Sequence, residues 1–236
     1  GTKKFIQNQI LMSYYKLKDR IFHHSENFKK LIEAQEGVQI MDTDDYGWEN
    51  YRYENDRFRL AHVERYSHMG LEVVHITCFP RENSKMPVFG FDVVGYQNDE
   101  KQMSKISGVF IDWSPILTHD KWHDTTWNKD RKLPYWATVF SDDFIAVRPT
   151  EDEYEKVFEV GFDAFERWLE RLNTDDDLTD DVSEIEQIIL RQNIYCEHQA
   201  SNKRTMGALT ANIGEEKARY FMTEVLFPKI KTDNLS

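Results

Sequence analysis

Residues 58–94 read FRLAHVERYSHMGLEVVHITCFPRENSKMPVFGFDVV, and their pattern indicates adjacent β-strands. Alternate positions are mostly apolar, as in a strand with one face in a core. This period of two extends from Tyr51 to Phe110 and predicts a meander of antiparallel strands. The positions expected to share one face are Phe58, Leu60, His62, Glu64 and Tyr66, then Leu71, Val73, His75, Thr77 and Phe79, then Val88, Gly90, Asp92 and Val94.

Helical patterns precede and follow this predicted sheet. Apolar residues recur at helical spacing between Ile6 and Ala34, which indicates one or two helices. A capping box, Thr150-x-x-Glu153, predicts the start of a helix that carries Phe158, Phe162, Phe165, Trp168 and Leu169 on one side. The other expected elements are strands near 108–113 and 144–147 and helices near 182–198 and 215–227. We therefore expect an α/β fold, a three-layer α/β/α sandwich with a central antiparallel sheet. It is expected to form one domain over residues 1–236, helical over 1–50, mainly sheet over 51–150 and mainly helical over 151–236.

The composition is globular and strongly acidic. The 236 residues are 40% hydrophobic and 31% charged, which excludes a disordered chain. A formal charge of −12 argues against nucleic acid and against an anionic membrane surface as partners. The two cysteines, Cys78 and Cys196, cannot by themselves hold an iron–sulfur cluster, and their scarcity favours a reducing, cytoplasmic location. No apolar stretch suggests a signal peptide or a membrane span, and we expect a monomer.

Four ionisable residues, His62, Glu64, His75 and Asp92, interrupt the apolar face of the strands. With a tight turn at His68–Met69, His62 is expected directly opposite His75, and Glu64 diagonal to it. A carboxyl or imidazole group on an apolar face loses hydration, which raises the pKa of the carboxyl and lowers that of histidine. Groups that titrate near neutral pH suit proton donation in catalysis. Single strand positions of this kind are also common as exposed residues or satisfied core hydrogen bonds, and the pattern leaves both interpretations open.

A second polar group, His119-x-x-x-His123 with Asp120 and Asp124, has a spacing that a helix could present to a metal ion. It lacks the glutamate of HExxH and lies in a polar, Trp-rich segment, so a metal-dependent hydrolase is the weaker hypothesis and no metal site is expected. No GxGxxG, Walker or GxSxG sequence occurs, so a redox enzyme with this sequence would take its electrons from elsewhere. Aromatic residues make up 14% of the chain, which fits either a Phe-rich core or a pocket for a flat conjugated ligand.

Over roughly residues 55–228 the sequence resembles the ferredoxin-dependent bilin reductases, and within them the branch that makes phycocyanobilin. The stretches that carry the resemblance are AHVE at 61–64, VHITCFP at 74–80, MPVFGFDVV at 86–94, DWSP at 112–115, LPYW at 133–136, VRP at 147–149, YC at 195–196, GE at 214–215 and VLFP at 225–228. Their order and spacing together are more specific than any one of them. Between Glu64 and His75 the chain is one residue shorter than the usual pattern, a difference expected in the turn.

The resemblance implies a bilin site between the sheet and the C-terminal helices, and no bound metal or organic cofactor. Single electrons would come from a [2Fe–2S] ferredoxin, and the substrate would be biliverdin IXα, reduced through bilin radicals. Asp92 and His75 match the family's catalytic pair, Glu64 matches its further proton donor, and His62 matches a histidine that supports the proton network. Glu64 favours a four-electron reduction to phycocyanobilin. The alternatives left open are reduction to phycoerythrobilin and, in a different class, a bilin-binding protein without catalysis.

The same resemblance suggests partners for the two propionates of biliverdin. Arg148, Arg204, Asn202 and Ser107 match family positions suited to this role, although each could be an ordinary surface residue. Because ferredoxins are acidic, docking on this acidic chain would need a local basic patch. The candidates for that patch are Lys203, Arg204, Lys229 and Lys231.

Overall fold

A computed structural model describes residues 16–118, 120–130 and 138–232. Its centre is a seven-stranded sheet in which each strand pairs antiparallel with its neighbour in sequence. The predicted meander is therefore confirmed, and it extends further towards the N-terminus than the pattern indicated. The strands are β1 (Gln39–Ile40), β2 (Glu49–Glu54), β3 (Phe58–His68), β4 (Leu71–Pro80), β5 (Val88–Asn98), β6 (Met103–Ser114) and β7 (Ile145–Val147).

The hairpin between β3 and β4 differs from the expected one by a single turn position. Its two-residue turn is Met69–Gly70, with φ values of 49° and 84°, because hairpins of this length favour positive φ at both positions. The expected turn at His68–Met69 is wrong, and Glu64 rather than His62 pairs directly with His75. Each partner moves by two positions, so the change of turn by itself leaves every side chain on its expected face.

A bulge at the start of β3 reverses one expected facing. The register shifts between Phe58 and Leu60, so the extra residue turns the strand locally. Leu60 packs with the C-terminal helices, whereas Phe58 belongs to the core on the other face of the sheet. The prediction that these two side chains share a face is wrong.

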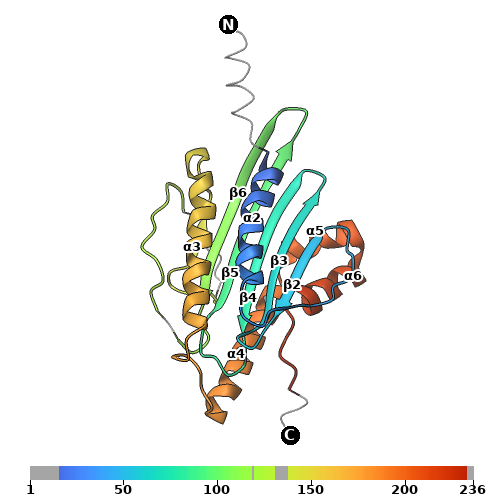
Figure 1. Cartoon of the computed structure of the whole chain (residues 1–236). Helices are drawn as coiled ribbons and strands as arrows, with labels where there is room; N and C mark the ends of the chain where they lie inside the picture. Colours follow the sequence, from blue (N-terminus) through green and yellow to red (C-terminus); the bar gives the residue numbers. More distant parts are fainter. Residues whose placement is uncertain (1–15, 119, 131–137, 233–236) are drawn as a thin grey trace.

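Helices cover both faces of the sheet, which confirms the three-layer α/β/α sandwich (Figure 1). One layer contains α2 (Leu17–Glu33) and α3 (Tyr154–Leu172), the latter entered through the predicted capping box and a short 3₁₀ turn, η1 (Glu151–Glu153). The expected helical segment before residue 16 lies outside the described residues. The opposite layer contains α4 (Val182–Ala200), α5 (Lys203–Ile213), α6 (Glu215–Tyr220) and the π-helical segment η2 (Phe221–Leu226).

Helix α5 was not expected from the sequence. Only Leu209 is buried along it, and Gly207 and two threonines lower its helix propensity, so the pattern is weak. It begins at Asn202, whose side chain accepts hydrogen bonds from the backbone N–H groups of Arg204 and Thr205. None of the described helices has the length and hydropathy needed to cross a membrane.

Candidate active site

The centre of the site is a row of three residues that run straight across three strands. Glu64 on β3 pairs with His75 on β4, and His75 pairs with Asp92 on β5. Directly paired residues of an antiparallel sheet point to the same side, so the two carboxyl groups flank the imidazole. His75 Nε2 lies 3.4 Å from Asp92 Oδ1. The row faces the layer of α4 and η2, because the ring of Phe227, just after η2, contacts His75 edge-on at 5.5 Å between centroids.

His62 lies in the next row on the same face, opposite Thr77. Its side chain is completely buried, and Nε2 is 2.8 Å from Asn50 Oδ1, which holds the ring in place. Asn50 itself pairs with Glu64 across β2 and β3. The structure therefore brings all four sequence-predicted residues of the sheet onto one face, with His62 beside the row rather than within it.

Burial shifts the titration of every group in the row. Loss of hydration raises the pKa of Glu64 to about 7, opposed by its hydrogen bond from Trp48. Loss of hydration, together with the nearby Glu64 carboxyl, raises the pKa of Asp92 well above its usual value. Burial lowers the pKa of His75 to about 4 and that of His62 well below its usual value. Burial therefore favours the protonated, uncharged form of both carboxyl groups and the neutral form of both imidazoles, and a pKa of about 7 suits Glu64 to proton transfer near neutral pH.

Asp92 is the most accessible member of the row. Its side chain keeps 27% of its surface exposed, against 9% for His75. Glu64 is buried, with 6% of the residue exposed. Protons from water can therefore reach Asp92 more directly than Glu64.

Trp48 is a site residue that the sequence did not reveal. Its indole Nε1 donates a hydrogen bond to Glu64 Oε2 at 3.0 Å. The ring contacts Tyr66 and Phe221 edge-on, with centroids 4.9 and 5.0 Å away. Trp48 ends a polar loop, and nothing in the alternating pattern of the strands connects that loop with Glu64.

Several buried polar atoms on this face have no hydrogen-bond partner among the described residues. They are His62 Nδ1, His75 Nδ1, Thr77 Oγ1 and Arg52 Nε. Arg52 and Thr77 flank His62 in one row across β2, β3 and β4. Because unpaired buried polar groups are costly, such a cluster between a sheet and its covering helices is typical of a ligand site.

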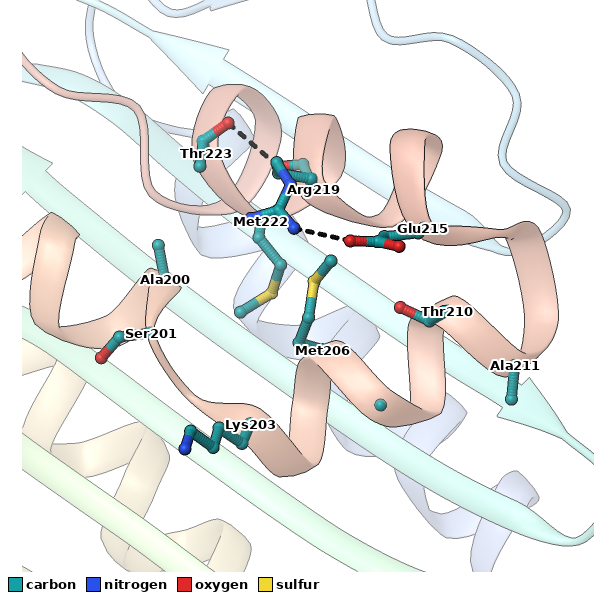
Figure 2. A pocket seen from close by; sticks show the side chains of 11 residues that line it. Ala200, Ser201, Lys203, Met206, Thr210, Ala211, Glu215, Arg219, Met222 and Thr223 are labelled. Atoms are coloured by element: carbon teal, nitrogen blue, oxygen red, sulfur yellow. Dashed lines mark hydrogen bonds and ion pairs between the residues drawn. The ribbon is translucent and has the colours of Figure 1, made fainter.

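The C-terminal layer contains a cavity of about 600 Å³ between the end of α4, α5, α6 and η2. Figure 2 shows the side chains of Met206 from α5 and Met222 from η2 lying between these two segments, with Lys203 at the edge. Both methionines pack into the same apolar cluster as Phe79 of β4 and Tyr195 of α4, which contact each other between the sheet and the helices. The cavity is open to the surface and is not lined by Glu64, His75 or Asp92.

The four residues expected to bind propionates do not form one group. Asn202 and Arg204 lie together at the start of α5, next to Lys203 of the cavity. Ser107 lies at a bulge of β6 and donates a hydrogen bond to the Val94 carbonyl at 3.1 Å. Arg148 is exposed just after β7, so it and Ser107 are held by other elements than the α5 pair.

Of the basic residues considered for ferredoxin docking, Lys203 and Arg204 are exposed at the same start of α5. Lys229 pairs with Glu197 at 2.9 Å, and Lys231 is exposed beyond η2. The four cations thus occupy two segments of the C-terminal layer.

The polar group considered for a metal site is engaged in other contacts. Both ring nitrogens of His123 take part in hydrogen bonds, to the Asp143 carbonyl and the Thr125 N–H. Asp120 pairs with Arg171 at 2.6 Å, and Asp124 pairs with Lys121. His119 lies outside the described residues. Within the part of the chain that is described, no three His, Cys, Asp or Glu side chains are grouped to hold a metal ion.

Comparisons with known proteins place these observations in context. Residues 20–228 match the family model of the ferredoxin-dependent bilin reductases. The phycocyanobilin:ferredoxin oxidoreductase of Synechococcus sp. is 30% identical, over 76% of this chain and 75% of the relative. The enzyme of the same description from Trichodesmium erythraeum gives the same values.

Two solved structures share the fold. Tomato phytochromobilin synthase in complex with biliverdin superposes with a TM-score of 0.64 and 18% identity, covering 89% of this chain and 82% of that one. The protein named PcyX superposes with a TM-score of 0.58 and 20% identity, covering 90% and 98%.

Proposed function

This chain belongs to the ferredoxin-dependent bilin reductases, and on that basis we propose that it reduces biliverdin IXα to phycocyanobilin with electrons from a [2Fe–2S] ferredoxin. Membership of this family makes this chain a ferredoxin-dependent oxidoreductase. The substrate, the product and the type of ferredoxin are the parts that we propose.

The observation that carries the proposal is the row Glu64–His75–Asp92. A buried carboxyl group, that of Glu64, and a half-buried one, that of Asp92, both have raised pKa values and flank one imidazole on the face that the C-terminal helices cover. A reductase that receives only electrons from its partner must supply every proton itself. Two separate carboxyl donors fit a reaction that protonates two separate positions of a long substrate.

The reaction adds four electrons and four protons to biliverdin. Each reduced [2Fe–2S] ferredoxin gives one electron, so the bilin passes through radical states. Asp92, with His75, protonates the bound bilin first and makes it a better electron acceptor, and this pair then serves the A-ring side. Glu64 supplies the proton for the vinyl group of the D-ring, and the exposed edge of Asp92 allows reprotonation from water. His62 supports His75 and Glu64 as part of the proton network.

The cavity over Met206 and Met222 is the proposed route from the surface to the sheet face. Unbranched methionine side chains change rotamer easily, so they suit a floor that must yield to an entering ligand. Arg204 and Asn202 at its edge are the proposed partners of one propionate, while Arg148 and Ser107 are the proposed partners from the sheet side. The adjoining cations of α5 would receive the acidic ferredoxin.

An anaerobic assay tests the proposal directly. The protein is mixed with biliverdin IXα, reduced [2Fe–2S] ferredoxin is added, and the extracted pigment is chromatographed against authentic phycocyanobilin and phycoerythrobilin. We expect the biliverdin absorption to fall, transient radical absorption to appear, and phycocyanobilin to elute. Phycoerythrobilin as the product would identify the alternative reductase. A coloured complex that does not change on addition of reduced ferredoxin would identify a bilin-binding protein without catalysis.

A further inference from the structure

Arg52 is a buried cation without an acidic partner among the described residues. Its side chain lies on β2 and only 8% of the residue is exposed. Among the described residues its side chain makes one hydrogen bond, from Nη2 to the Glu224 carbonyl of η2, which is long at 3.4 Å, and its Nε has no partner there. Burial lowers the pKa of its guanidinium, and the titratable side chains that act on it are those of Tyr46 and Tyr220 rather than a carboxylate.

The other buried arginine of this part of the sheet is fully partnered. Arg65 on β3 faces the opposite, α2 side and binds Glu49 at 2.6 Å and Glu26 at 2.7 Å. Its Nη1 also donates to Ser25 at 3.1 Å. A buried guanidinium normally needs such partners, because its lost hydration is costly. Arg52 therefore costs folding stability that its visible contacts do not return.

The position of Arg52 relates it to the proton donors. It pairs directly with His62, and the next pair on the same face is Asn50 with Glu64. Arg52 therefore lies at the Glu64 end of the site, two strands away from His75 and three from Asp92. The unpartnered Nδ1 of His62 and Oγ1 of Thr77 continue the same row.

We propose that Arg52 is a substrate-binding residue whose guanidinium donates to the lactam carbonyl oxygen of the terminal bilin ring that Glu64 protonates. The inference rests on the proposed function. The two propionates of a bilin are on its central rings, whereas each terminal ring carries a lactam oxygen. Because Arg52 lies beside Glu64, the proton donor of a terminal ring, its guanidinium would contact the lactam oxygen of that ring. Its charge would also stabilise negative charge that develops on that ring when an electron arrives.

Arg52→Met and Arg65→Met form a matched pair for the test. In Arg52→Met an apolar chain of similar length replaces an unpartnered charge, so the midpoint of urea unfolding should stay or rise. The Kd for biliverdin, measured by absorption titration, should rise about tenfold or more, because a charge-assisted hydrogen bond to the ligand is lost. Arg65→Met should unfold at lower urea and bind biliverdin like the unmodified chain. Arg52→Lys should restore part of the affinity, since it keeps the charge without the planar fork.

Biliverdin dimethyl ester distinguishes the propionate oxygens from the lactam oxygens of the ligand, because esterification removes the charge of the propionates and leaves the lactams unchanged. If Arg52 binds the lactam oxygen, the affinity loss in Arg52→Met persists with the ester. Disappearance of the loss with the ester would assign Arg52 to a propionate and overturn the lactam assignment. Equal biliverdin affinity of Arg52→Met and the unmodified chain, or a fall in unfolding midpoint as large as that of Arg65→Met, would overturn a ligand role altogether.

The same titration distinguishes failure of the proposed function from failure of the role of Arg52. An unmodified chain that does not bind biliverdin would refute both ideas. An unmodified chain that binds and reduces biliverdin, with Arg52→Met behaving identically, would refute only the role of Arg52.

Discussion

The indole of Trp48 donates a hydrogen bond to Glu64 Oε2 at 3.0 Å, and this bond opposes the effect of burial on the Glu64 carboxyl. A hydrogen bond to the charged form lowers a carboxyl pKa, so Trp48 keeps that of Glu64 near 7 rather than higher. A donor with this pKa can release its proton and recover it at neutral pH. A residue of the loop before β2 thereby helps to determine the pKa of Glu64 on β3.

Trp48→Phe should raise the pKa of Glu64 above about 7, because burial then acts without the opposing hydrogen bond. The alkaline limb of the pH profile for the Glu64-dependent reduction should move to higher pH. Trp127→Phe is the matched control, since Trp127 packs on the other side of the sheet. An unchanged limb in Trp48→Phe would show that the indole does not tune this carboxyl.

Asp92→Asn should bind biliverdin normally but reduce it at least about 100-fold more slowly, the usual size of a lost proton donor. Single-turnover absorption after addition of reduced ferredoxin measures the rate. Asp112→Asn is the control, because Asp112 lies on the same sheet and accepts hydrogen bonds from Ser114 and from Ser141. It should lose stability while its folded fraction keeps turnover. Normal turnover by Asp92→Asn would exclude Asp92 as the donor.

Glu64→Gln should stop the reaction at a partly reduced bilin, because the amide cannot supply a proton to the second position. The pigment is extracted after prolonged reaction and chromatographed against authentic bilins. We expect it to be a two-electron product rather than fully reduced phycocyanobilin. The biliverdin Kd should change little, since glutamine keeps the size of the side chain and can still accept the Trp48 hydrogen bond. Complete conversion to phycocyanobilin by this variant would remove the role assigned to Glu64.

The same variant should also change how stability depends on pH. Glu64 has a pKa of about 7 in the folded protein against an ordinary 4.5, so the folded state holds this proton more tightly than the unfolded chain. The free energy of unfolding should therefore fall as the pH rises from about 4.5 through about 7. Relative to Glu64→Gln, the unmodified chain should lose up to about 3 kcal/mol over this window.

Urea unfolding of the two proteins at pH 5 and pH 8 measures this difference. His75 has the opposite effect, because its lowered pKa makes stability fall as the pH drops from about 6.5 through about 4. That contribution is common to both proteins and cancels in the comparison. A difference that is constant between pH 5 and pH 8 would show that Glu64 is not a buried acid.

The alternating pattern predicted the face of the sheet correctly although the turn was misplaced. A strand has a period of two, so moving the turn from His68–Met69 to Met69–Gly70 shifts partners by two and preserves every facing. The bulge beside Phe58 breaks that rule, because one added residue reverses the facing locally and leaves no mark in the pattern. Helix α5 escaped prediction for a related reason, since a single buried leucine gives no stripe.

The amino-acid sequence by itself determined the sandwich, the family and the common face of Glu64, His75 and Asp92, because these depend on local periodicity and on motifs in fixed order. Only the tertiary structure decided that Glu64 rather than His62 faces His75, that Trp48 binds Glu64, and that Arg52 is buried with no acidic partner in the described part of the chain. Those relationships join a loop, an early strand and a C-terminal helix that are far apart in the chain. Their contacts arise from packing across layers, which no local pattern records.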